Sequence, residues 1–224
     1  MNYLFLLTIL FMLFFISITE QRLRNLINLS SEIHLIIKGS GNQSFINNTF
    51  YPQPSEVYIN GTSRESCKTF CEIEYEENYI IDDINSTNAT NITNIVKNNV
   101  TLIFNETIES CERMFGELDN IIEIDLSHFD FSRVTTMSFM FRKCSNLERI
   151  IFGDINTSSL INLKGTFYFC SNLPYIDLSH FNTSLINTTE GLFYNCSNLE
   201  SINLTNFNTT NIKTLRMTFY NCYK

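Results

Sequence analysis

The chain has 224 residues, of which 44% are hydrophobic and 17% are charged, so it carries enough apolar side chain for a folded core. Its seven Gly and three Pro argue against a collagen-like or Pro/Gly-rich chain. The formal net charge of −8 argues against a nucleic-acid partner, because phosphate contacts need clustered Lys and Arg and the sequence has no such cluster.

An apolar segment, Leu4–Ile18, has the length of the hydrophobic part of a signal peptide rather than that of a membrane-spanning helix. We expect residues 1–19 to be a signal peptide that is cleaved before Glu20 and leaves no membrane span. Retention of this segment as an anchor is the alternative. Both outcomes place the mature protein outside the cell, either secreted or at the cell surface.

Fifteen N-x-S/T triplets favour the same location, since composition alone would give roughly six. Residues 85–99 form a polar stretch dense in these triplets, which is typical of an exposed loop. We expect N-linked glycans at Asn88, Asn91 and Asn99. Triplets inside the repeat region, such as that of Asn156, have a second explanation, which is an Asn required at a fixed turn position.

Residues 20–110 contain no internal repeat. Short apolar segments with strand-like composition occur at 33–38, 57–59 and 101–104, and turn residues separate them. This pattern predicts a β-rich N-terminal cap region.

Residues 111–224 contain a 26-residue repeat. Phe recurs at this interval from Phe115 to Phe219, and Cys recurs from Cys144 to Cys222. Four complete units precede a short remainder, so we expect an array that is truncated at its C-terminal end. The units are 115–140, 141–166, 167–192 and 193–218.

Each unit carries two apolar patterns. The pattern L-x-x-I-x-L has strand spacing in its last part, and it predicts strands near 124–126, 150–152, 176–178 and 202–204. A second pattern has i, i+3, i+4, i+7 spacing, as in the segment 137–144, and it predicts a short helix whose first amides are capped by residues such as Thr136.

The strings D-L-S-H-F-D-F-S-R-V-T-T-M-S-F-M-F at 125–141 and C-S-N-L-E at 144–148 resemble the BspA-like leucine-rich repeats. Together with the period, the resemblance implies an α/β fold, namely a leucine-rich-repeat solenoid of about four 26-residue repeats, each with one short strand and one short helix, after the β-rich cap. It also implies binding rather than catalysis, as in secreted or surface-exposed receptors and adhesins of bacteria and protists.

The seven cysteines divide into two groups. The four repeat cysteines have equivalent inward positions, so we expect buried free thiols. For the other three, two pairings are open: Cys71 with Cys111 would join the cap to the first repeat, and Cys67 with Cys71 would close a small loop. A zinc site would need a fourth Cys or His ligand at a familiar spacing, and the sequence has none. We expect no cofactor.

The strings D-L-S-H at 125–128 and 177–180 contain the residue types of a hydrolase. Neighbouring strand residues point to opposite faces, so Ser127 and His128 are not expected to act as nucleophile and base. A metal stripe of His128, Asp154 and His180 would place the two His roughly 10 Å apart. We therefore expect a protein that is not an enzyme.

The variable positions beside the predicted strands are the candidate binding surface for an extracellular protein or glycan. A structural or decoy coat glycoprotein without a specific ligand is the alternative function. The unpaired C-terminal edge also suggests homo-association. The candidate partner-binding residues are Glu123, Asp125, Glu148, Arg149, Tyr175, Asp177, Glu200 and Asn203.

Overall fold

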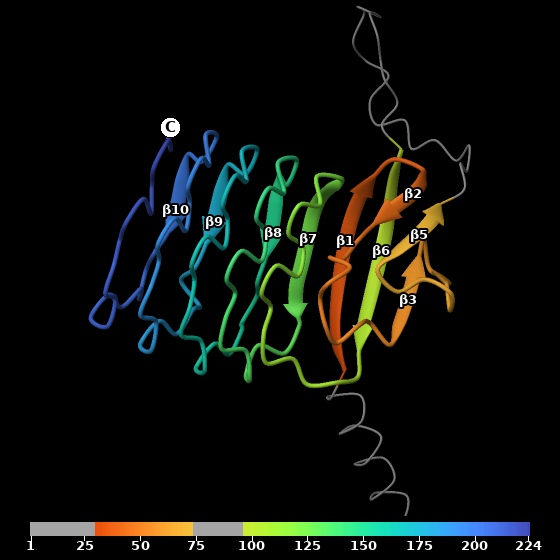
Figure 1. The fold of residues 1–224 in the computed structure, drawn as a ribbon, viewed down its shortest axis with the longest axis horizontal. Helices are drawn as coiled ribbons and strands as arrows, with labels where there is room; N and C mark the ends of the chain where they lie inside the picture. Colours follow the sequence, from red (N-terminus) through yellow and green to blue (C-terminus); the bar gives the residue numbers. More distant parts are fainter. Residues whose placement is uncertain (1–29, 74–95) are drawn as a thin grey trace, which may run out of the picture.

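The computed structural model describes residues 30–73 and 96–224, and within these residues it contains strands and turns but no helix (Figure 1). Ten strands form one six-stranded sheet and two sheets of two strands. The strands are β1 (Ser31–Lys38), β2 (Gly41–Ser44), β3 (Glu56–Ile59), β4 (Thr62–Ser63), β5 (Phe70–Ile73), β6 (Lys97–Phe104), β7 (Ile121–His128), β8 (Arg149–Ile151), β9 (Tyr175–Asp177) and β10 (Ser201–Asn203).

The large sheet has the strand order β4-β3-β6-β1-β7-β8, so strands from the N-terminal region and from the first repeats belong to one sheet. Strand β1 lies between β6 and β7 and pairs antiparallel with both. Its residues alternate between buried and half-buried, as a strand with one solvent-facing side should. The side chains of Ile33, Leu35 and Ile37 therefore enter the core, and those of the residues between them face outward.

The repeats continue away from this sheet, side by side, toward the C-terminus at the far end of the molecule (Figure 1). Strand β7 pairs parallel with β8, and β9 pairs parallel with β10. Each observed repeat strand lies within a few residues of its predicted position. The predicted segments at 33–38, 57–59 and 101–104 correspond to β1, β3 and β6.

The predicted helix of each repeat is absent, and the segment 137–144 shows why. Its amides at Met140 and Cys144 donate to carbonyls only three residues back, at 3.1 Å each, which closes single turns rather than a helix. The alternate amides donate instead to the next repeat: Phe139 donates to the carbonyl of Lys164 at 2.9 Å, and Phe141 to that of Thr166 at 2.9 Å. Pairing between repeats thus uses the backbone groups that a helix would need.

The α/β leucine-rich-repeat solenoid expected from the sequence is therefore wrong. The described residues form a mixed β fold with several sheets and no helix. The apolar i, i+3, i+4, i+7 pattern that suggested the helix arises from successive tight turns, which also return side chains to the core at intervals of three and four residues.

The interior of the repeat region contains a stack of the phenylalanine rings that recur every 26 residues. Phe141 and Phe167 have ring centroids 5.5 Å apart with an interplanar angle of 7°, and Phe167 and Phe193 are 5.5 Å apart at 3°. The stack extends to Phe115 on one side and Phe219 on the other. The 26-residue interval therefore becomes a repeating contact in the core.

The cysteines beside this stack are free thiols, as predicted, and each of the four repeat cysteines donates a hydrogen bond from Sγ to a carbonyl one repeat earlier. Burial raises the pKa of Cys144 and of Cys196 to about 12, so these thiols stay protonated. In the N-terminal region the disulfide joins Cys67 to Cys71. Cys111 is a buried free thiol, so the Cys71–Cys111 pairing is not formed.

Three sequence predictions lie outside the described residues: the signal peptide at 1–19 and the glycan sites at Asn88 and Asn91. In residues 30–73 and 96–224 there is no helix long and apolar enough to cross a membrane.

Candidate binding face

The outward side of the large sheet brings together side chains from strands that are far apart in the sequence. Register places Thr101 of β6 opposite His34 of β1, and His34 opposite Asp125 of β7. Asp125 in turn pairs with Ile151 of β8. We call the outward-facing residues of β6, β1, β7 and β8 the binding face.

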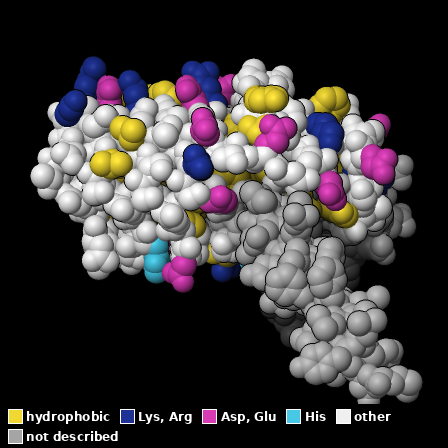
Figure 2. All heavy atoms as spheres, turned by 90° about the horizontal axis from the view of Figure 1, so that it is seen from below, with side chains coloured by type: hydrophobic (Ala, Val, Ile, Leu, Met, Phe, Trp, Pro, Cys, Tyr) yellow, Lys and Arg dark blue, Asp and Glu magenta, His cyan; other side chains and the backbone are white. Residues whose placement is uncertain are grey.

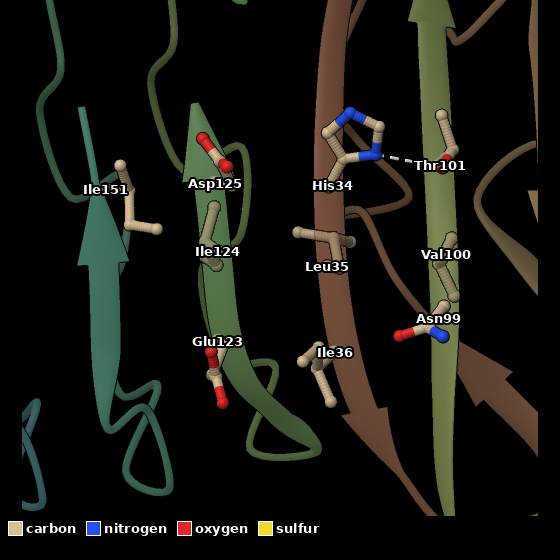
Figure 3. A pocket seen from close by; sticks show the side chains of 10 residues that line it. All are labelled: His34, Leu35, Ile36, Asn99, Val100, Thr101, Glu123, Ile124, Asp125 and Ile151. Atoms are coloured by element: carbon tan, nitrogen blue, oxygen red, sulfur yellow. Dashed lines mark hydrogen bonds between the residues drawn. The ribbon is translucent and has the colours of Figure 1, made fainter. Parts of the chain in front are cut away.

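A hollow of about 270 Å³ lies in the middle of this face (Figure 3). Figure 3 shows the side chains of His34 and Asp125 toward one end of the hollow, with Glu123 and Ile36 further along their strands. Ile151 borders the hollow from β8. The lining therefore combines carboxylates, an imidazole and aliphatic groups on a rigid sheet.

His34 is held by two contacts. Its Nδ1 lies 3.1 Å from Oγ1 of Thr101, and its Nε2 lies 3.2 Å from a carboxylate oxygen of Glu32. Its ring also meets that of His128 edge to face, with centroids 6.3 Å apart. These contacts fix the imidazole beside Asp125.

Asp125 remains ionised through local hydrogen bonds. Burial alone would raise the pKa of its carboxyl, but hydrogen bonds from the hydroxyl and the amide of Ser127, together with the nearby charge of His34 and His128, outweigh burial and lower this pKa. The Ser127 amide donates to Oδ1 of Asp125 at 2.9 Å. Asp125 therefore presents a fixed negative charge at the hollow.

The predicted partner-binding residues fall into three groups. Glu123 and Asp125 line the hollow, and the guanidinium of Arg149 lies 3.8 Å from Glu123. Glu148 and Glu200 are exposed residues that precede β8 and β10, and Glu200 pairs with Lys224 at 3.0 Å.

The other three predicted residues form a small cluster on β9 and β10. The hydroxyl of Tyr175 and the amide nitrogen of Asn203 both donate to Oδ2 of Asp177, at 3.1 and 3.2 Å. The pKa of Asp177 is lowered to about 2, first by hydrogen bonds from the side chain and amide of Ser179. This cluster is separate from the hollow.

Sequence reasoning missed His34 and Thr101 as members of this site, and it predicted Asn99 only as a glycan site. The alternation of buried and outward residues in 31–38 could have identified His34 as outward-facing. Strand β1 pairs with both β6 and β7, and these pairings bring His34 beside residues about 65 and 90 positions later in the chain. Asn99 is exposed and borders the hollow, so a glycan attached there would stand at its entrance.

Four N-x-S/T triplets of the repeats are turns in which the Asn side chain accepts a hydrogen bond from the amide two residues later. These bonds measure 3.1 Å at Asn156, 3.1 Å at Asn182, 3.1 Å at Asn203 and 2.8 Å at Asn208. Asp130, at the position equivalent to Asn156, makes the same bond at 2.9 Å. A turn requirement that Asp also meets therefore explains these Asn, as the alternative interpretation held.

Although Ser127 and His128 are neighbours on a strand, Oγ of Ser127 and Nδ1 of His128 lie within hydrogen-bonding distance, 3.1 Å apart, at the end of β7. The order of groups still differs from that of a catalytic triad. Asp125 contacts Ser127, so the serine lies between aspartate and histidine, whereas a triad requires the histidine between them.

A metal site is not apparent in the described part of the chain, where no group of three or more His, Cys, Asp or Glu is arranged to hold an ion. Of His128, Asp154 and His180, the metal stripe that the sequence disfavoured, two are in contact, since Nδ1 of His180 lies 3.1 Å from Oδ1 of Asp154. Seen from below, the surface is mostly uncharged, and acidic and basic side chains alternate along one rim (Figure 2). Glu190 illustrates such alternation, since it pairs with Lys164 at 3.2 Å and with Arg216 at 3.6 Å.

Comparison with known proteins gives one match. The sequence model of a family described as "Mycoplasma protein of unknown function, DUF285" matches residues 109–224, slightly more than half of the chain. The assignment to BspA-like leucine-rich repeat proteins is therefore corrected, together with the leucine-rich repeats it implied. No curated protein and no solved structure matches the chain.

Proposed function

The chain belongs to the DUF285 family, and we propose that it is a secreted or cell-surface glycoprotein that binds a protein or glycan partner, without catalysis, through the binding face. The observation that carries the proposal is the hollow, in which groups from β6, β1, β7 and β8 converge. Concave sites with a few convergent polar groups on an apolar base are the usual form of binding sites.

The support for an extracellular location comes from the sequence. The apolar segment Leu4–Ile18 has the properties of a signal peptide, and the eleven N-x-S/T triplets other than those four turns still exceed the roughly six expected from composition. The support for a non-catalytic role is the arrangement of Asp125, Ser127 and His128, which does not provide an activated nucleophile.

The test is saturable binding of the labelled, deglycosylated chain to cells or extracellular matrix. An Asp125→Asn/Glu123→Gln variant should lose most of this binding, because it changes the binding face at two points. Asp130→Asn is the control, since it also removes one negative charge but leaves a residue type found at the equivalent position 156. Absence of saturable binding by the parent would contradict the proposal and favour the coat glycoprotein.

We also propose self-association through the last repeat. The side chains of Leu215, Met217, Phe219 and Tyr223 are 63%, 45%, 51% and 75% exposed, which makes an apolar end surface.

A further inference from the structure

We propose that the hollow binds a basic side chain of a partner protein, a Lys ammonium or an Arg guanidinium, held by Glu123 and Asp125. This inference rests on the proposed function and specifies the chemistry of its site. It concerns a protein partner and not a glycan.

The geometry provides two anionic groups on one strand. Glu123 and Asp125 are two residues apart in β7 and both face outward, which places them roughly 6.6 Å apart along the strand. A cation between them can hydrogen-bond either carboxylate, and such charge-assisted bonds are stronger than neutral ones. Both residues line the hollow, so the cation would be partly removed from water.

The hollow also provides aliphatic contacts of the right kind. Ile36 from β1 and Ile151 from β8 are half-buried residues that border it. Lys and Arg side chains pack their methylene stems on apolar surfaces while their charged heads remain polar. A side chain lying along the sheet would therefore use both the carboxylates and the two isoleucines.

The local charge favours a cation over the other candidate ligands. Glu32 adds a third carboxylate beside His34, and the cation that lies near Glu123 is Arg149 at 3.8 Å. The side chain of Arg149 is 65% exposed, so this pair is weak and exchangeable. A neutral sugar could donate hydroxyl hydrogen bonds to the two carboxylates, but it would leave their negative charge uncompensated as they lose hydration.

Another repeat shows that an uncharged Asn can replace Asp125 without changing the backbone turn. At position 203, equivalent to Asp125 in the repeat, an Asn accepts the same turn hydrogen bond from the amide two residues later, at 3.1 Å. Asp125→Asn should therefore keep the turn with Ser127 and remove only the charge. Glu123→Gln is the corresponding change at the second carboxylate.

The experiment titrates the full, deglycosylated chain with Nα-acetyl-lysine amide and Nα-acetyl-arginine amide, and follows the methyl resonances of Ile36 and Ile151. We expect saturable shifts with both compounds and none with the neutral analogues acetyl-norleucine amide and acetyl-citrulline amide. Asp125→Asn and Glu123→Gln should each weaken binding about fivefold to tenfold. Asp130→Asn, the charge-matched control, should leave the affinity unchanged.

The outcomes separate this inference from the proposed function. Equal shifts with lysine and norleucine compounds, or binding unaffected by both carboxylate variants, would overturn the basic-group proposal even if the chain binds cells. Saturation by a neutral methyl glycoside without response to lysine or arginine would overturn it in favour of a glycan. Absence of cell or matrix binding, with the lysine and arginine response intact, would instead contradict the proposed function alone.

Discussion

Single residues with left-handed backbone recur at two positions of the 26-residue unit. The first position is occupied by Arg113, Phe139, Gly165, Gly191 and Met217, and their φ values lie between 53° and 62°. Side chains with a Cβ are disfavoured in this region by roughly 1 to 2 kcal/mol, so the non-glycine members are held there by the pairing between repeats. Glycine at two of these positions removes the cost.

Gly165→Ala should destabilise the protein more than Gly191→Ala. Both substitutions add a Cβ at positive φ, but a Cβ at 165 would overlap the ring of Phe139, whereas at 191 the nearest atom is 3.5 Å away in Tyr168. We expect a loss of about 1 to 2 kcal/mol for Gly191→Ala and about 1 to 3 kcal/mol more for Gly165→Ala. Urea unfolding measures both, and a Phe139→Ala background should abolish the difference. If both substitutions lower the free energy of unfolding equally in the parent background, the ring of Phe139 moves aside without cost.

Ser179→Ala should raise the pKa of Asp177 from about 2 toward its ordinary value of 3.8, because the serine hydroxyl is the first of the groups that lower it. The backbone amide of residue 179 would still donate, so the rise should be partial. Since the folded-state pKa is lowered, these interactions stabilise the fold above pH 4, and their contribution is lost as the pH falls toward 2. Carboxyl ¹³C titration checks the value. Ser184→Ala, which removes a hydroxyl bonded to Asn182, should leave it unchanged.

At the scale of the elements, the turns that replace the predicted helices cooperate with the phenylalanine stack. Alternate amides bond the next repeat, and this keeps consecutive units close enough for the rings of Phe141, Phe167 and Phe193 to remain parallel. A residue in the middle of the stack thus contributes to two interfaces between repeats.

Phe167→Ala should cost roughly 3 to 5 kcal/mol of unfolding free energy, because it removes a buried ring that stacks on both sides and leaves a cavity. Leu185→Ala is the control at a 51% exposed position and should change the stability by less than about 0.5 kcal/mol. Denaturant titration with constant m-value gives both numbers. Equal unfolding midpoints of the Phe167→Ala variant and the parent would show that the stacked ring does not contribute to stability.

At the scale of the whole molecule, the two ends of the repeat region differ. Its first strand, β7, is covered by β1 of the N-terminal region. At the other end, Gly191, Phe193 and Asn195 donate their amides to the repeat that contains Leu215 and Tyr223, whose apolar side chains are exposed.

Leu215→Lys/Tyr223→Lys should abolish concentration-dependent association, because the added charges oppose contact between two such apolar surfaces. Light scattering of the parent at high micromolar concentration should show dimers or larger species, and the double variant should remain monomeric. Leu185→Lys adds charge at a position outside this end and should associate like the parent. A monomeric parent would show that the exposed apolar surface does not drive association.

The sequence by itself determined the 26-residue period, the recurrence of phenylalanine at that interval, the repeat strands to within a few residues and the free repeat cysteines. These features depend on which side chains recur at fixed intervals, and such recurrence is visible in a single chain. The sequence also allowed two explanations of the N-x-S/T triplets in the repeats, a glycan site or an Asn required by a turn. A hydrogen bond to the amide two residues later supports the turn explanation at Asn156, Asn182, Asn203 and Asn208.

Only the tertiary structure decided that the repeats contain turns instead of helices and that the candidate site extends onto β1 and β6. The apolar spacing at 137–144 suits both conformations locally, and hydrogen bonds to the following repeat select the turns. His34 and Asp125 meet because β1 pairs with β7 across about 90 residues. Such pairings are set by the free energy of the whole sheet, to which a local pattern of residues contributes only a part.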